Sequence, residues 1–148
     1  MNFTFAGLGV AMVEPYSRIE YLYLSSALAK RTRFYSEADR AVLETVRCGV
    51  LFVMAFWSGP ARLAFQELKR VLEKVDPEGK LELVVIDTDG CPDIYELPEF
   101  VGKMHGAGET AWVREGKMVR TSGLGYRPEC FEPYTRLLLK ECQATVTE

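Results

Sequence analysis

Two short apolar runs constrain the fold of this chain more than any other feature of its sequence. Residues 49–56 read GVLFVMAF and residues 81–87 read LELVVID. Both runs are rich in strand-forming residues, and their nearly continuous apolar character predicts strands that are buried on both faces. Residues 61–76, between them, have the pattern of an amphipathic helix, with Pro60 at its start. The sequence therefore predicts a strand–helix–strand unit at the centre of the fold.

Further helices and strands surround this unit. Buried strands joined by helices form parallel pairs with right-handed crossovers, and a terminal hairpin adds antiparallel strands at the edge. The expected fold class is therefore α/β, a three-layer sandwich in which helices flank a central mixed sheet. We expect helices at residues 36–47, 92–104 (with a break at Pro98) and 130–142, a strand at residues 31–35, and a hairpin that turns at residues 115–117.

The chain of 148 residues is long enough for one domain with its own core. We expect the domain to occupy residues 31–148 and residues 1–30 to form an N-terminal extension packed on it. Residues 1–15 are apolar but too short for a membrane span, and no positive charge precedes the apolar stretch. Residues 17–30 mix strand and helix patterns, and we favour a helix.

Composition narrows the choice of partners. The net charge is −3, and no cluster of lysine and arginine is interleaved with aromatic residues, so we expect no nucleic-acid partner and no membrane partner. The short basic run KRTR at residues 30–33 is typical of a solvated face.

The cysteine pattern predicts neither a metal site nor a cofactor. The four cysteines, Cys48, Cys91, Cys130 and Cys142, form no Cys-x-x-Cys pair, and the single histidine, His105, is expected on the surface. Cys48 borders a buried strand and Cys142 closes an amphipathic helix. We interpret both as small core residues in a reducing compartment, which predicts a cytoplasmic location.

The residues WSGPAR, Trp57 to Arg62, lie where the first buried strand meets its helix. The chain here resembles the thioredoxin family, in which a buried strand leads into Trp-Cys-Gly-Pro-Cys-Lys/Arg and then a helix. Trp57, Gly59, Pro60 and Arg62 match that motif, and the order of elements extends the resemblance over residues 31–142. The resemblance implies a thioredoxin-like fold and a groove that receives an extended peptide from a partner.

Four departures remove the family's chemistry. Ser58 and Ala61 stand where the family has its attacking and resolving cysteines, and a serine oxygen cannot undergo thiol–disulfide exchange. Phe52 stands where the family has a buried aspartate. Glu109, before the matching Thr110, stands where the family has a cis-proline. A cis bond before glutamate costs about 3 kcal/mol, so we expect a trans peptide and a reshaped loop.

The resemblance and its departures together predict a redox-inactive module rather than an enzyme. We expect it to bind a protein or an extended peptide in a chaperone-like, scaffold or inhibitor/immunity-type role. Trp112 is expected either to flank the groove or to belong to the core. The predicted groove residues are Trp57, Ser58, Gly59, Pro60, Ala61, Glu109 and Thr110.

Cys91 offers an alternative function, a thiol-dependent oxidoreductase. It lies between the end of the second buried strand and the start of a predicted helix. Neighbouring parallel strands end at the same edge, so Cys91 is expected near Ser58, and a helix N-terminus lowers the pKa of a thiol.

Two other interpretations stay open at this point. The run VVIDTDG resembles the first motif of haloacid-dehalogenase-type phosphatases, which implies Asp87 as nucleophile, Asp89 as acid–base and a magnesium ion. A later acidic pair for the metal does not occur in the sequence. Alternatively, WSGPAR is the plain start of a helix in another α/β fold.

Overall fold

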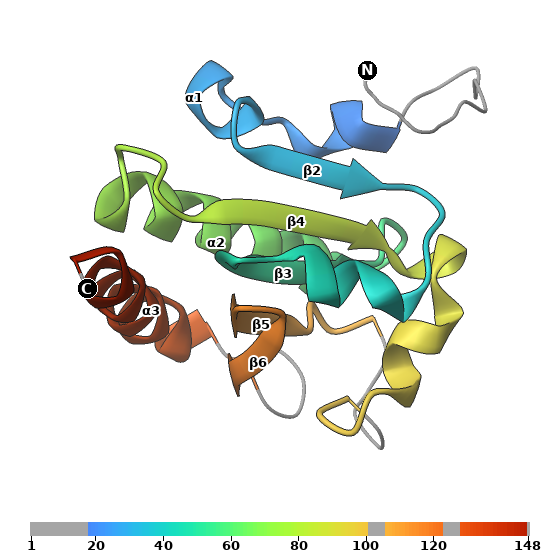
Figure 1. The fold of residues 1–148 in the computed structure, drawn as a ribbon. Coiled ribbons are helices and arrows are strands. Elements are labelled where there is room, and N and C mark those ends of the chain that lie inside the picture. The colour runs from blue at the N-terminus through green and yellow to red at the C-terminus, as the bar shows by residue number, and fades with distance from the viewer. Residues whose placement is uncertain (1–17, 101–105, 123–127, 148) are drawn as a thin grey trace.

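The computed structural model describes residues 18–100, 106–122 and 128–147. Within these residues a five-stranded sheet forms the centre of the molecule (Figure 1). The strands are β2 (Thr32–Tyr35), β3 (Cys48–Met54), β4 (Glu82–Asp87), β5 (Thr110–Arg114) and β6 (Lys117–Thr121).

The sheet is mixed and has the order β2-β4-β3-β5-β6. Strands β2, β4 and β3 run parallel, with Phe52 of β3 opposite Val85 of β4. Strands β5 and β6 continue the sheet in antiparallel orientation, with Phe52 opposite Thr110 of β5. The two apolar runs therefore form β3 and β4 in the middle of the sheet, where both faces are covered.

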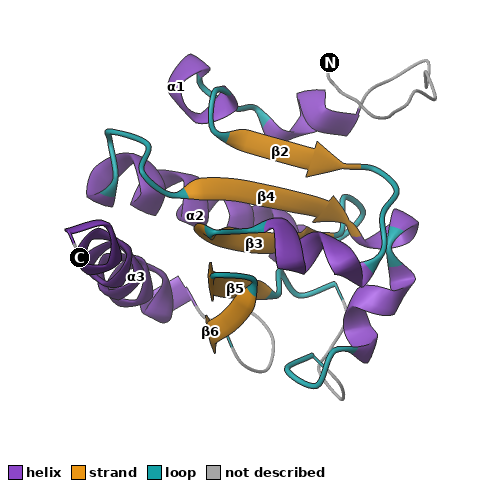
Figure 2. Ribbon diagram, in the orientation of Figure 1, coloured by secondary structure: helices purple, strands orange, loops and turns teal. Residues whose placement is uncertain are grey.

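Helices cover both faces of the sheet, in the three layers that the sequence predicts (Figure 2). The sheet divides the core into two clusters, one on each face, because successive residues of a strand point to opposite faces. Phe52 packs with the helices α2 and α3, whereas Leu51 and Val53 pack with two short 3₁₀-helices on the other face. These elements are α2 (Gly59–Val75), α3 (Phe131–Thr147), η2 (Arg40–Thr45) and η4 (Pro92–Glu96).

The α-helix predicted at residues 36–47 is wrong in type and in its start. Asp39 caps a 3₁₀-helix there by accepting a hydrogen bond from the amide of Ala41 at 2.9 Å. Before it, the chain lies against the turn after β4: a Cβ at Gly90 would sit 1.7 Å from the carbonyl oxygen of Ser36. The amide of Ala38 donates to the Gly90 carbonyl at 3.0 Å. This contact holds the chain out of a helix over the first predicted turn.

In its described part, the helix predicted at residues 92–104 is also replaced by a short 3₁₀-helix, η4. This helix ends at Glu96, and the next residue, Leu97, has an extended backbone (φ −65°, ψ 140°). A residue before proline is disfavoured in helical conformation, and Pro98 follows directly. Residues 101–105, which include His105, lie outside the described residues.

The N-terminal extension is helical in its described part. It contains a 3₁₀-helix η1 (Arg18–Leu22) and a one-turn helix α1 (Ser26–Ala29), and residues 1–17 lie outside the described part. Leu22 and Leu28 are buried and join the core beneath α2. No helix of the described residues is long and apolar enough to cross a membrane.

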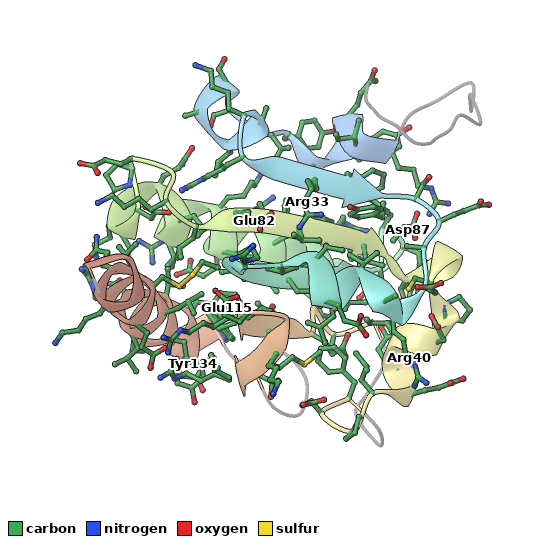
Figure 3. The ribbon with its side chains drawn as sticks, viewed as in Figure 1. Arg33, Arg40, Glu82, Asp87, Glu115 and Tyr134 are labelled. Carbon is green, nitrogen blue, oxygen red and sulfur yellow. A yellow bond between two sulfur atoms is a disulfide. The ribbon has the colours of Figure 1, made fainter. Side chains whose placement is uncertain are left out.

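A disulfide joins Cys48, at the start of β3, to Cys142 of α3, with an S–S distance of 2.03 Å (Figure 3). The expectation that both are reduced is therefore wrong, whereas their expected position in the core is confirmed. Helix α3 crosses the sheet where β3 begins, and this brings the two Cα atoms to 6.3 Å, a separation that a disulfide spans. Cys91 and Cys130 are not part of this disulfide.

Candidate functional site

Ser58 is the N-cap of α2, not an exposed nucleophile. Its backbone is extended (φ −104°, ψ 123°), and its Oγ accepts a hydrogen bond from the amide of Ala61 at 3.3 Å. The hydroxyl donates in turn to the carbonyl of Gly106. The side chain is 6% exposed, so its proton and an oxygen lone pair are both used in holding the loop at residues 106–110 to the helix.

The loop at residues 106–110 closes over the first turn of α2. Gly106 and Gly108 have positive φ angles of +81° and +80°. A Cβ at Gly108 would lie 2.7 Å from the Cβ of Ala64 and 3.4 Å from the Cα of Ala61. This close approach requires glycine in the loop and small side chains on the helix.

The predicted groove residues do come together, but they enclose no open crevice in the described part of the chain. Ser58, Ala61, Glu109 and Thr110 are all buried. Gly59 is half-buried and Pro60 is exposed at the start of α2. The motif and the loop are therefore in packed contact, and Trp57, 62% exposed, lies at its margin, where a Cβ on Gly106 would sit 2.6 Å from the indole ring.

Glu109 belongs to a buried polar network. The peptide bond before it is trans, as expected. Its carboxylate accepts hydrogen bonds from the Tyr95 hydroxyl at 3.2 Å and the Ala107 amide at 3.4 Å. Thr88 donates to the same Tyr95 oxygen at 3.0 Å. Burial raises the pKa of Tyr95 to about 12, and the charge of Glu109 adds to the shift, so the phenol stays protonated and can donate.

Apolar packing occupies the position of the family's buried aspartate. The Phe52 ring lies 4.9 Å from the Phe65 ring, centroid to centroid. Trp112 is core as well: it is buried and donates its indole N–H to Thr135 Oγ1 at 3.0 Å, with Tyr134 edge-on at 5.1 Å. Of the two interpretations of Trp112, the core position is correct.

Cys91 is a buried thiol in this fold. Its side chain is buried among the apolar residues beneath η4, and its Sγ donates to the Asp93 carboxylate at 3.4 Å. Burial, with a smaller effect of Asp93, raises its pKa to about 12. The expectation that a helix N-terminus lowers this pKa is wrong, because only the short 3₁₀-helix η4 follows and an acidic side chain faces the sulfur.

Asp87 and Asp89 hold the N-terminal extension. Arg18 donates to Asp87 Oδ2 at 2.7 Å and to Asp89 Oδ2 at 3.3 Å, and Trp57 donates its indole N–H to Asp89 Oδ1 at 3.3 Å. Asp87 lies at the carboxyl end of β4 (Figure 3). Burial raises the pKa of Asp87, and the hydrogen bonds from the Asp89 amide and from Arg18 oppose that shift. Among the described residues no group of three or more potential ligands is arranged to hold a metal ion.

An exposed hollow lies between the extension and the motif. Its volume is about 450 Å³. Tyr23, Trp57 and Tyr21 are 77%, 62% and 51% exposed, which is unusual for side chains of this size. We call this feature the aromatic hollow, and its lining residues are Arg18, Tyr21, Tyr23, Phe56, Trp57 and Arg62.

Specific contacts fix the walls of the aromatic hollow. The Arg18 guanidinium carbon lies 5.5 Å from the centroid of the Phe56 ring, and Tyr21 meets the same ring edge-on at 6.3 Å. Lys69 of α2 donates to the carbonyls of Leu22 at 2.7 Å and Tyr23 at 3.2 Å. The hollow is therefore held from the extension, from the loop after β3 and from α2.

Sequence reasoning located only Trp57 and Arg62 of this site. The other lining residues come from the extension and from the residue before Trp57. The one local signal was the alternation of Ile19, Tyr21 and Tyr23, which was ambiguous between strand and helix.

Comparison with known proteins places the fold. No protein-family model and no curated protein matches the chain. Solved structures do match: mitochondrial thioredoxin 3 of Saccharomyces cerevisiae, in its oxidized form, is 19% identical over 73% of this chain and 95% of that one, with a TM-score of 0.52. Thioredoxin of Schistosoma mansoni is 18% identical over 72% and 94%, also with a TM-score of 0.52. Thioredoxin of Fasciola hepatica is 21% identical over 69% and 97%, with a TM-score of 0.50.

These likenesses define the class of protein: the chain has a thioredoxin-like fold, as the sequence resemblance implies. Within that class it adds an ordered extension, and it carries a helix-capping serine at the strand-to-helix junction.

Proposed function

We propose that this protein is a redox-inactive interaction module that binds an extended segment of a partner protein in the aromatic hollow. The observation that carries the proposal is Trp57: it belongs to the family-like motif and is 62% exposed beside a hollow, while Ser58 and Ala61 of the same motif are buried. Large aromatic side chains left in solvent around a concavity mark binding sites.

Two properties of the motif support a role without electron transfer. The hydroxyl oxygen of Ser58 accepts a hydrogen bond from the Ala61 amide, and its proton is donated to the Gly106 carbonyl. Position 61 carries a methyl group and is fully buried. Neither position supplies a thiolate, which is the nucleophile that disulfide exchange requires.

The Cys48–Cys142 disulfide favours a second candidate, an oxidoreductase that works through this pair. Its position argues against that function. Cys48 lies at the start of β3, roughly 20 Å of strand away from the motif at the other end. Cys142 of α3 is buried, which leaves a substrate disulfide little access to its sulfur.

Selection from a phage-displayed library of random dodecapeptides tests the proposal. Peptides that bind the wild-type protein should lose at least tenfold in affinity against Trp57→Ala. The matched control is Leu63→Ala, which removes another exposed apolar side chain from α2, 60% exposed and outside the hollow. Selected peptides that bind the two variants equally would place the binding surface elsewhere and contradict the proposal.

Insulin-disulfide reduction tests the redox-inactive part of the proposal. With dithiothreitol present, the protein should accelerate the precipitation of insulin no more than an equal amount of serum albumin does. Turnover that is lost in the Cys48→Ser variant would support the second candidate instead.

A further inference from the structure

We propose that the segment bound in the aromatic hollow is acidic: its carboxylates face Arg62, and its apolar or aromatic side chains cover the rings of Tyr23 and Trp57. This inference rests on the proposed function and specifies the chemistry of the partner.

The charge of the lining favours an acidic partner. The lining residues include two arginines and no carboxylate. Arg18 already holds Asp87 and Asp89. Arg62 is exposed, and the only hydrogen bond of its guanidinium within the described residues runs from Nη1 to the carbonyl of Phe56 at 2.8 Å. A guanidinium has five N–H donors, and its complementary group is a carboxylate.

The size of the hollow favours an extended segment over a folded partner surface. A volume of about 450 Å³ lies in the range of small-ligand sites. A stable interface between folded domains buries about 800 Å² on each partner and needs a broader surface. A few residues of an extended chain, with alternate side chains directed at the aromatic rings, fit the hollow better.

The backbone at Tyr23 gives independent support. Its φ angle of 52° lies in the left-handed region, which bulky residues rarely adopt. Lys69 holds this conformation by binding the carbonyls of Leu22 and Tyr23. Tyr23 is 77% exposed, so burial of its ring contributes little to the stability of the fold. Strained backbone that presents a side chain to solvent is typical of ligand-binding positions.

Three synthetic peptides test the proposal: Ac-Glu-Phe-Glu-Tyr-Glu-NH₂ and its counterparts with Gln or Lys in place of every Glu. Titration of the ¹⁵N-labelled protein is followed by NMR at the two indole N–H resonances. The acidic peptide should shift the resonance of exposed Trp57 and leave that of buried Trp112 in place. The Gln peptide should bind about tenfold more weakly, and the Lys peptide more weakly still.

Variants assign the preference to Arg62. Arg62→Gln should weaken the acidic peptide about tenfold and bring its affinity close to that of the Gln peptide. Arg62→Lys keeps the charge and should stay within about threefold of the wild type, which separates loss of charge from disturbance of the Phe56 loop. Lys140→Gln removes one positive charge from the exposed surface of α3 and is the matched control, with unchanged affinities.

The outcomes separate the two proposals. If the Gln or Lys peptide shifts Trp57 at concentrations equal to those of the acidic peptide, the acidic preference is refuted and the binding module stands. The acidic preference is also refuted, and the binding module stands, if library peptides without Asp or Glu bind the wild type but not Trp57→Ala. If neither the synthetic nor the selected peptides bind at Trp57, both proposals fail.

Discussion

Arg18 Nη1 donates to Asp87 Oδ2 at 2.7 Å, joining the N-terminal extension to the end of β4 across 69 residues of sequence. The same guanidinium lies against the Phe56 ring and reaches Asp89, which also accepts the indole N–H of Trp57. One side chain thus connects the extension, the central sheet and the motif loop. The geometry of the aromatic hollow depends on this connection.

Arg18→Gln should lower the free energy of unfolding by about 1 kcal/mol at neutral pH, because Asp87 loses its cation. Burial already raises the pKa of Asp87 in the folded protein above 3.8. The stability that this carboxyl contributes is therefore fully present below 3.8 and is lost as the pH rises through the folded pKa. Without Arg18 the folded pKa rises further. The loss should therefore shrink as pH falls below the folded pKa, where Asp87 is protonated with or without Arg18. Urea unfolding between pH 4 and 8 measures it.

The control for this prediction is Arg40→Gln, which removes an exposed arginine that lies 3.9 Å from its partner Glu96. It should change stability by less than about 0.5 kcal/mol at any pH in the series. An Arg18→Gln loss that is equal at pH 4 and pH 8 would mean that Asp87 is not the group that responds.

Ser58→Ala should destabilise the fold by about 1–2 kcal/mol, because α2 loses its N-cap and the loop at Gly106 loses its tether. Ser26→Ala is the matched control, since Ser26 is exposed on the one-turn helix α1. Chemical denaturation compares the two variants. Equal stability would show that the Ser58 hydroxyl is not structural.

Restoring both thiols should not restore a reductase. In a Ser58→Cys, Ala61→Cys double variant, the sulfur at position 61 enters a fully buried position beside the loop at Gly108, where a Cβ on Gly108 would lie 3.4 Å from the Cα of residue 61. We expect two additional thiols in a titration with Ellman's reagent after denaturation, lower stability, and insulin reduction no faster than that of the wild type. Rapid turnover by the variant would show that the loop opens.

Reduction of the Cys48–Cys142 disulfide should lower stability by about 4 kcal/mol, because the bond closes a loop of 94 residues and restricts the unfolded chain. Thermal unfolding with and without dithiothreitol measures the shift in Tm. Cys48→Ser with Cys142→Ser should melt like the reduced protein and no longer respond to dithiothreitol. Cys130→Ser should respond as the wild type does, because Cys130 is not part of the bond.

Tyr23→Gly should stabilise the fold by about 1 kcal/mol while peptide binding is lost. Glycine adopts the left-handed conformation without the steric cost that tyrosine bears at φ 52°. Tyr21→Gly is the matched control: it removes an aromatic ring of the same hollow but also the contact with Phe56, so it should destabilise. Calorimetry and the peptide titration test both variants. A destabilised Tyr23→Gly would remove the argument from backbone strain.

Elements whose pattern is complete within a short stretch were predictable. The strands β3 and β4, the helix α2 and the hairpin of β5 and β6 follow from continuous apolar runs, 3.6-residue spacing and the turn at Gly116. The first turn of the helix predicted at residues 36–47 does not form. The contact that prevents it is with Gly90, which lies far along the chain and outside any local pattern.

The site was predictable in its motif but not in its shape. Ser58, Ala61 and Glu109 were identified as departures from a redox family, but the closure of the crevice depends on positive φ angles at Gly106 and Gly108, which sequence spacing does not reveal. The aromatic hollow joins the extension to the motif, and its lining has no periodicity that a local pattern could show.

The bond between Cys48 and Cys142 also sets how the molecule can be stretched. A force applied to the two ends of the chain passes from β3 straight into α3, so the segment between the two cysteines, whose sequence separation is 94, carries no tension. Most of the sheet and all of α2 lie within that span. An unfolding motor that pulls on one terminus would have to thread two segments of polypeptide side by side when it reaches the disulfide. Reducing the disulfide would release roughly 300 Å of additional contour length.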